Sequence, residues 1–330
     1  MNPADERAVN PVDERAVNPV DERPVNLVDE RAVGPAQESR GDPEPDRPAG
    51  RPVDPDEAGR RLRRPSALRT LRVGDFRVSY VPDGAMLLKP AGRLPTVPAA
   101  RWDVYADHLN DTARLVANTG GLLVELGPEA LLVDAGFGPR LVPDDPSDAA
   151  LGAVHGGWLP AGLARLGRRP ETIGAVAFTH LHADHIGWAC ADPPLFPEAT
   201  FFVPESEWAQ HRLSPEAARM LTPRLALVAP GRQILPGVET FALPGHTTGH
   251  TGYTITSRGT RLLAFGDALT TPLQIRHPDW SASNDADPHQ STRHRLRLIA
   301  ELRRPDTIGF GIHFADVVFG RVQGDAWIPV

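Results

Sequence analysis

The segment 179–187 concentrates side chains that bind metal ions. Its reactive members are His180, His182, Asp184 and His185. Neutral imidazole nitrogens and carboxylate oxygens are the usual protein ligands of zinc and similar divalent ions. Neither packing in a core nor exposure to solvent explains four such groups within six residues. His180 and His182 can point the same way, whereas Asp184 and His185 can face a second ion. The spacing therefore predicts a metal site with room for two ions.

A short apolar run rich in β-branched residues, 173–178, precedes the motif and predicts a buried strand that ends at the histidines. The pattern His-x-His-x-Asp-His resembles the signature of the metallo-β-lactamase-fold hydrolases. Further ligands in that family come from later loops, and His246, Asp267 and His313 match them here, each after a strand-like apolar run. The resemblance extends over about Leu71 to Val322.

The resemblance implies a dinuclear centre. The first metal would be held by His180, His182 and His246, the second by Asp184, His185 and His313, with Asp267 bridging the two. Such ions lie roughly 3.5–4 Å apart and share a hydroxide nucleophile, because a zinc-bound water loses its proton near pH 7. Asp184 is the candidate to orient this nucleophile or to move a proton. Zinc is the favoured metal, and Mn, Fe or Co also suit these ligands.

The substrate class is narrowed by the segment between the last two ligands. Gln274, His277–Trp280 and Asp285–Pro288 resemble the branch that contains methyl parathion hydrolases and related lactonases. Acyl-homoserine lactonases of this fold carry a tyrosine three residues after the bridging aspartate, and Thr270 stands at that position, which argues against a lactonase that depends on it. We expect a neutral ester, lactone or phosphotriester, bound between apolar walls drawn from Phe137, Trp188, Leu269, Trp280 and Phe314.

Three other functions remain open from the sequence. A mononuclear iron persulfide dioxygenase shares the fold but uses essentially two histidines and one aspartate, so the complete second ligand set argues against it. A true β-lactamase is exported and lacks the bridging aspartate. The third alternative is a non-catalytic, metal-stabilised scaffold whose N-terminal tail recruits a partner.

Composition limits the partners and the compartment. The formal charge of −7 argues against a nucleic-acid surface, and no apolar run reaches the roughly 20 residues of a membrane span. Arg60–Arg64 resembles part of a twin-arginine signal, but no apolar region follows it. The single cysteine, Cys190, excludes an internal disulfide and fits a reducing cytoplasm. We therefore expect a cytoplasmic enzyme with a small-molecule substrate, and a homodimer is left open.

An octapeptide repeat opens the chain. The segment 2–9 recurs nearly unchanged from Asn10, Asn18 and Asn26. Its recurring prolines interrupt helices, and its few small apolar residues cannot offset the entropy of ordering. The composition stays rich in Pro, Arg, Asp and Glu up to about residue 66. We predict a disordered tail over residues 1–66 and a hydrolase domain over 67–330.

The predicted elements of the domain follow a strands-then-helix order that occurs twice. This order favours two β-sheets packed face to face with helices outside, a four-layer αββα sandwich. The expected strands of the first half are 76–81 and 86–89, joined by a turn at Pro82–Gly84, then 114–126 and 130–134. The expected helices are 98–109, 159–166, 215–227 and 291–302. Asp134, at a strand end, is predicted either to support a ligand histidine or to shape a turn.

Overall fold

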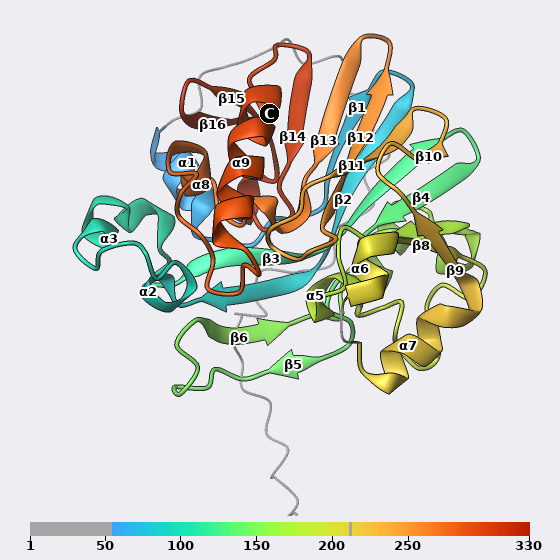
Figure 1. Ribbon diagram of the computed structural model, residues 1–330, viewed down its shortest axis with the longest axis horizontal. Helices are drawn as coiled ribbons and strands as arrows, with labels where there is room; N and C mark the ends of the chain where they lie inside the picture. Colours follow the sequence, from blue (N-terminus) through green and yellow to red (C-terminus); the bar gives the residue numbers. More distant parts are fainter. Residues whose placement is uncertain (1–54, 211–212) are drawn as a thin grey trace, which may run out of the picture. The chain divides into compact units, whose positions relative to one another are not determined.

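The structure is a computed structural model and describes residues 55–210 and 213–330. Two β-sheets form its centre (Figure 1). The larger sheet has the strand order β5-β6-β2-β3-β4-β7-β8-β9, with β1 paired to β2, and the smaller sheet runs in sequence order from β10 to β16. The strands of the larger sheet are β1 (Arg69–Val73), β2 (Phe76–Leu88), β3 (Leu115–Leu126), β4 (Glu129–Val133), β5 (Leu141–Val142), β6 (Leu151–His155), β7 (Ala175–Ala177), β8 (Thr200–Pro204) and β9 (Leu225–Val228).

Helices cover the outer faces of the two sheets. The strands of the smaller sheet are β10 (Gln233–Leu235), β11 (Val238–Ala242), β12 (Thr251–Ser257), β13 (Thr260–Ala264), β14 (Thr307–Phe310), β15 (Phe319–Gln323) and β16 (Ala326–Pro329). The α-helices are α1 (Pro55–Leu62), α2 (Pro90–Arg93), α3 (Arg101–Val104), α4 (Leu159–Arg165), α5 (Ala183–Ile186), α6 (Glu205–Gln210), α7 (Pro215–Leu221), α8 (Leu273–Arg276) and α9 (Pro288–Leu302). Short 3₁₀ turns are η2 (Ala106–His108), η3 (Pro170–Thr172), η4 (Thr222–Arg224), η5 (Gly266–Ala268) and η6 (Ala315–Val317).

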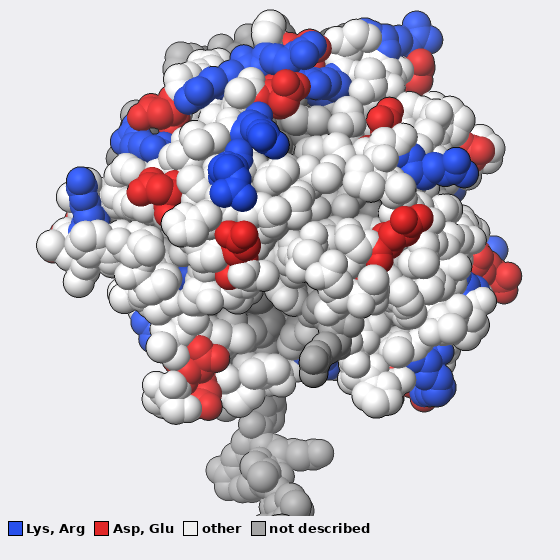
Figure 2. Space-filling model, in the orientation of Figure 1, with Lys and Arg blue, Asp and Glu red and all other residues white. Residues whose placement is uncertain are grey.

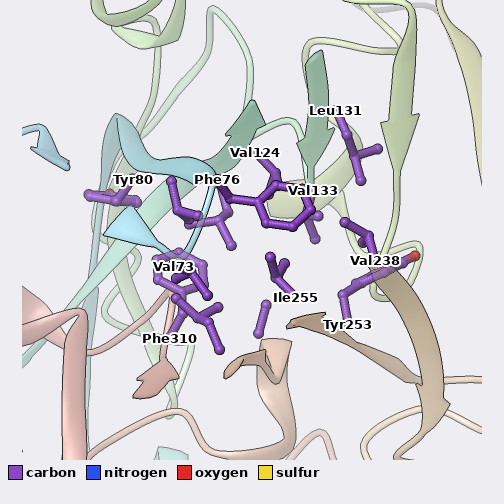
Figure 3. Close-up of a cluster of buried hydrophobic side chains, with 14 of the residues drawn as sticks. Val73, Phe76, Tyr80, Val124, Leu131, Val133, Val238, Tyr253, Ile255 and Phe310 are labelled. Atoms are coloured by element: carbon purple, nitrogen blue, oxygen red, sulfur yellow. The ribbon is translucent and has the colours of Figure 1, made fainter. Parts of the chain in front are cut away.

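The side-chain alternation of the strands builds the layers. In β3, Leu122 and Val124 point between the sheets, whereas Leu123 packs on the outer side with α4. Figure 3 shows the inner cluster, to which both sheets contribute, for example Val124 from β3 and Ile255 from β12. On the outer face of the smaller sheet, α9 packs against β14 and β15. The expected four-layer αββα sandwich is therefore confirmed.

One predicted turn is wrong. The Pro82–Gly84 segment does not reverse the chain, because β2 continues through it with only a shift of register against β3. The carboxylate of Asp83 is buried there and accepts hydrogen bonds from four backbone N–H groups of other segments, among them those of Phe137 and Leu159. Distant partners thus replace the local turn.

Two predicted helices are also shorter than expected. The region 98–109 divides into α3 and η2, and the region 215–227 ends its helix at Leu221 and enters strand β9 at Leu225. Strand β9 pairs in parallel with β8, which supplies the hydrogen bonds that a longer helix would have provided. Each of the described helices is too short or too polar to cross a membrane.

The boundary of the predicted tail is placed too late. Residues 55–66 belong to the same compact unit as the rest of the described chain. Leu62 of α1 packs against the outer cluster of the smaller sheet, and Arg64 forms an ion pair with the buried Asp316. These long-range contacts compensate for the polar composition of the segment. The predicted disorder of residues 1–54 lies outside the described residues.

Candidate metal centre

Strand ends bring the predicted ligands together. His180 and His182 lie between β7 and α5, and Asp184 and His185 lie in α5 itself. The other three occupy loops or turns that follow strands of the smaller sheet: His246 after β11, Asp267 in η5 after β13, and His313 after β14. Because β13 and β14 are parallel, their carboxyl ends meet at one edge and place Asp267 beside His313.

The seven side chains converge on one small region. Three groups have their potential ligand atoms within 4.8 Å of one another: His180, His182 and His246; His180, His185 and Asp267; and Asp184, His185 and His313. Within the first group, Nδ1 of His182 lies 2.8 Å from Nε2 of His180 and 3.1 Å from Nε2 of His246. Every residue expected at the site from the sequence is present in these groups.

Asp267 lies between the two sets of side chains. Its Oδ1 atom is 3.1 Å from Nε2 of His185 and 2.8 Å from Nε2 of His313. Its Oδ2 atom is 3.3 Å from Nε2 of His246. The two oxygens of one carboxylate therefore face different histidine groups, which is the arrangement of a bridging ligand.

The burial of these atoms tests whether cations fit the site. Nε2 of His185, Nε2 of His313 and Oδ1 of Asp267 are buried and form no hydrogen bond of regular geometry with the described residues, although Oδ1 lies 3.1 Å and 2.8 Å from the two nitrogens. Buried polar atoms without a partner cost free energy, so native structures satisfy nearly all of them. A divalent cation would accept electron pairs from all three atoms at once. The donor set thus fits a metal centre.

Hydrogen bonds at the other ring nitrogen orient the ligand histidines. Nδ1 of His185 lies 2.9 Å from the carboxylate of Asp134, so Asp134 contacts a candidate ligand, which is one of the two roles predicted for it. Nδ1 of His313 donates to the backbone oxygen of Asn118 at 2.7 Å. In each case Nε2 is left to face the centre, which fixes the ring for metal binding.

A buried glutamate connects two ligand loops and was not found from the sequence. Oε1 of Glu207 accepts a hydrogen bond from the backbone of Leu181, between the first two histidines. Oε2 accepts from Thr247 Oγ1 at 2.6 Å and from the backbone of Gly249, both in the loop of His246. No local pattern marks this residue, because a glutamate in the first turn of a helix is ordinary.

The electrostatic environment separates the histidines into two classes. Burial and neighbouring histidines lower the pKa of His180 well below its usual value, and burial lowers the pKa of His182 to about 4. Burial also opposes the charged form of His185, but Asp184, Asp134 and Asp267 outweigh it and raise its pKa. Burial alone would raise the pKa of Asp267, and the surrounding histidines instead hold it well below the usual range. Asp267 is therefore anionic, as a bridging ligand must be.

An arginine that the sequence did not single out faces the same carboxylate. Arg93 of α2 is 9% exposed, and its Nη2 lies 4.0 Å from Oδ2 of Asp267. Its Nε is buried and makes no hydrogen bond within the described part of the chain. A buried guanidinium whose Nε has no partner, beside a candidate active site, is a potential binding group for a substrate oxygen.

The residues expected to form apolar and aromatic walls take part in the packing of the domain. Leu269 and Phe314 are fully buried in the outer core of the smaller sheet, and Trp188 donates its indole N–H to Asp83. Phe137 and Trp280 belong to a separate hydrophobic cluster. These residues contribute to packing, and none of them lines either of the two cavities that adjoin His182.

Two cavities adjoin His182 instead. The larger, of about 490 Å³, is lined by aliphatic residues such as Leu181, Ile186 and Leu213, with Arg140 among its polar members. The smaller, of about 210 Å³, is more polar and includes His246, Glu207, Gln210, Thr248 and Asn284. A substrate held at the candidate centre could therefore extend to either side of His182.

Comparison with known proteins gives one family. The model of the metallo-beta-lactamase superfamily matches residues 122–311. An N-acyl homoserine lactonase from Bacillus sp is 27% identical over 236 residues, which are 64% of this chain and 90% of the relative. Among solved structures, AidC, a dizinc quorum-quenching lactonase in complex with a product, superposes with a TM-score of 0.69 at 21% identity and covers 80% of this chain and 98% of its own. A probable metal-dependent hydrolase from Staphylococcus aureus superposes with a TM-score of 0.69 at 22% identity. The match covers 79% of this chain and 99% of that structure's chain.

Proposed function

This chain belongs to the metallo-beta-lactamase superfamily, and on that basis we propose that it is a dinuclear metal-dependent hydrolase of neutral esters, lactones or phosphotriesters. The observation that carries the proposal is the position of Asp267, whose two oxygens face different histidine groups. The first ion would be bound by His180, His182 and His246, and the second by Asp184, His185 and His313, with Asp267 between them. Zinc is the expected metal, and Mn, Fe or Co would also fit.

Two divalent ions, when bound, supply a hydroxide near neutral pH and polarise the oxygen of the substrate. Asp184 is the residue of this chain that we assign to orienting the nucleophile, because its side chain is 17% exposed whereas that of Asp267 is 3% exposed. Burial opposes its ionisation, but the charges of His185 and His313 lower its pKa below the usual range. Asp184 is thus an ionised hydrogen-bond acceptor that can orient a nucleophile, and its lowered pKa makes it a weak base.

The surroundings of the centre support a neutral, partly apolar substrate. The larger cavity presents Leu181, Ile186 and Leu213 beside His182. On the face shown in Figure 2, Lys and Arg gather mainly along the upper edge, near α9, and away from α5 and α6. A polyanion such as RNA would require basic residues along its path, whereas an ester needs one polar anchor and apolar contacts.

The position of Thr270 favours a substrate anchor other than a tyrosine. Its hydroxyl is buried and donates to Oε1 of Gln274 at 3.3 Å, and its backbone N–H donates to the same atom. Thr270 is therefore part of the local structure and does not present a free hydroxyl to a substrate carbonyl. The Nη2 atom of Arg93 lies 4.0 Å from Oδ2 of Asp267 and its Nε makes no hydrogen bond among the described residues, and we assign the anchoring role to this guanidinium.

A hydrolysis panel on protein of known metal content tests the proposal. Aryl esters, lactones and phosphotriesters should be cleaved faster than phosphodiesters, and cleavage should stop on treatment with a chelator and in Asp184→Ala. Oxygen uptake with a persulfide substrate should be absent. Preferred cleavage of phosphodiesters would contradict the role of the apolar cavity, and inactivity on the whole panel would contradict hydrolysis and favour a scaffold.

A further inference from the structure

The arginine-rich segment 60–64 contacts the loop of a candidate ligand. Arg64 donates to Oδ2 of Asp316 from both Nε, at 3.0 Å, and Nη2, at 2.8 Å. Arg61 donates from Nε to the backbone oxygen of Asp316 at 2.9 Å. Arg69, at the start of β1, pairs with Oδ1 of the same carboxylate. Asp316 is 2% exposed, so three arginines from the N-terminal part of the domain converge on one buried charge.

Asn118 of β3 also connects the N-terminal part of the domain to the loop that contains His313. Its side-chain oxygen accepts a hydrogen bond from the backbone N–H of Ser66 at 2.8 Å. Its side-chain amide donates to the backbone oxygens of Ile312 and Ala315, on either side of His313. Its own backbone oxygen accepts the hydrogen bond from Nδ1 of His313. The orientation of His313 and the position of residues 61–69 are therefore linked through one asparagine.

The loop needs such support because its backbone is strained. Ala315 has a φ of +41°, a left-handed conformation that residues with a Cβ adopt only at a cost. It persists where surrounding contacts determine the conformation, and here the contacts come from Asn118 on one side and from Arg61 and Arg64 on the other. Removing partners of a buried carboxylate leaves an uncompensated charge, so the loop would rearrange to reach water.

We propose that residues 61–69 form a latch that positions His313, so that occupancy of the second metal site depends on the contacts of the latch with Asp316 and Asn118. Arg61, Arg64 and Arg69 are positioning residues, since none of them touches the candidate centre. The inference rests on the proposed dinuclear site. It assigns a role to the arginine-rich segment that the metal chemistry alone leaves unexplained.

The test compares metal binding in full-length variants. In Arg64→Gln/Arg69→Gln, both changes lie at half-exposed side chains, 56% and 40%, so neither opens a cavity. The matched control is Arg258→Gln/Arg276→Gln, which removes the same charge from exposed ion pairs with Asp75 and Asp325. Metal-stripped protein is titrated with Co²⁺ in competition with a chelator. The binding step that is lost in His313→Ala is assigned to the second site.

The variant Arg64→Gln/Arg69→Gln should bind the second Co²⁺ about tenfold more weakly, as expected when a group that orients a ligand is lost. Its affinity for the first Co²⁺ should equal that of the wild type. The control should bind both ions like the wild type, and Arg64→Lys/Arg69→Lys should recover part of the affinity. Unchanged affinities with a lower melting temperature would overturn the latch, because they indicate a purely structural contact. If the double variant does not fold, Arg64→Gln alone is judged by the same criterion. If the wild-type chain binds one ion, the dinuclear centre and the latch are both refuted. If the variant binds two ions with the same affinities as the wild type, the latch alone is refuted.

Discussion

Nδ1 of His246 lies 2.9 Å from Oδ1 of Asp285, and both side chains are fully buried. The other oxygen of this carboxylate pairs with Arg295, which also donates from Nε to the backbone of Ala268, next to the bridging Asp267. Burial would raise the pKa of Asp285, but the hydrogen bond from His246 and the charge of Arg295 keep it below its usual value. An ionised Asp285 therefore fixes the ring of His246 with Nε2 toward the centre.

Replacement of this support should weaken the first metal site selectively. Asp285→Asn keeps the shape of the side chain but removes the negative charge that strengthens the hydrogen bond from His246. We expect the affinity for the first ion to fall roughly tenfold to hundredfold. Metal competition with a chelator measures it. Asp287→Asn is the control, since the side chain of Asp287 caps α9 through the N–H of Gln290 and forms no hydrogen bond or ion pair with a candidate ligand among the described residues. Equal loss in both variants would argue against a specific role for Asp285.

The metal content itself gives the second prediction. Protein purified without a chelator should contain about two divalent ions per chain by elemental analysis, because both ligand sets are complete. His246→Ala should lose chiefly the first ion and His313→Ala the second. Asp267→Asn should weaken both, since a neutral amide bridges two cations poorly. One ion or none in the wild type would be incompatible with a dinuclear centre.

The candidate ligands are predicted from the resemblance to a known family, and the strands that precede His180, His246, Asp267 and His313 agree with that prediction. A strand end exposes a side chain at the edge of a sheet, and parallel strands such as β13 and β14 bring their ends together. Among the supporting residues, only Asp134, at a strand end, is predicted from the sequence, and the others are not. Asp285 reaches His246 across 39 residues, and Asn118 reaches His313 across 195. Such pairs depend on the packing of the two sheets, which one sequence does not reveal.

The errors in the predicted elements have the same origin. Pro82–Gly84 has the local chemistry of a turn, yet pairing of β2 with both β3 and β6 keeps the strand continuous. The polar composition of residues 55–66 is typical of a tail, yet the buried Asp316, about 250 residues away, holds the segment in place. Local propensity is a weak guide wherever a distant buried charge supplies the partner.

Cys190 should be unreactive at neutral pH. Burial raises the pKa of its thiol to about 11, against about 8.5 for a free cysteine. The thiolate fraction at pH 8 is then roughly a thousandth, so alkylation by iodoacetamide should be about 100-fold slower than for free cysteine. The rate should rise about tenfold per pH unit until the pH approaches the raised pKa. Mass spectrometry after timed alkylation of the native protein measures the rate, and a rate that levels off near pH 8.5 would contradict the raised pKa.

Two truncations should behave differently. Deletion of residues 1–54 removes the repeats, whose composition cannot build a core, and should leave the melting temperature and turnover unchanged. Deletion of residues 1–66 also removes Arg61 and Arg64 from Asp316. We expect this deletion to lower the free energy of unfolding by about 2 kcal/mol, which corresponds to a melting temperature lower by roughly 4–8 °C. Equal melting temperatures for the two truncations would show that residues 55–66 contribute nothing to stability.

Arg93 gives the last prediction, which concerns how the substrate is held. Hydrogen bonds to a charged group contribute about 1.5–3 kcal/mol, so Arg93→Met should lower kcat/KM by roughly 10–100-fold, chiefly through KM if the contact already forms in the bound substrate.

Two measurements separate this role of Arg93 from mere support of Asp267, which lies 4.0 Å away. The metal content of Arg93→Met should stay at the wild-type value, and guanidinium added to Arg93→Ala should restore part of the activity, because it supplies the missing donors. Arg276→Gln, at an exposed ion pair, should show neither the loss nor the rescue. An unchanged KM, or a loss of activity that follows the loss of metal, would show that the guanidinium stabilises the bridging carboxylate and does not bind the substrate.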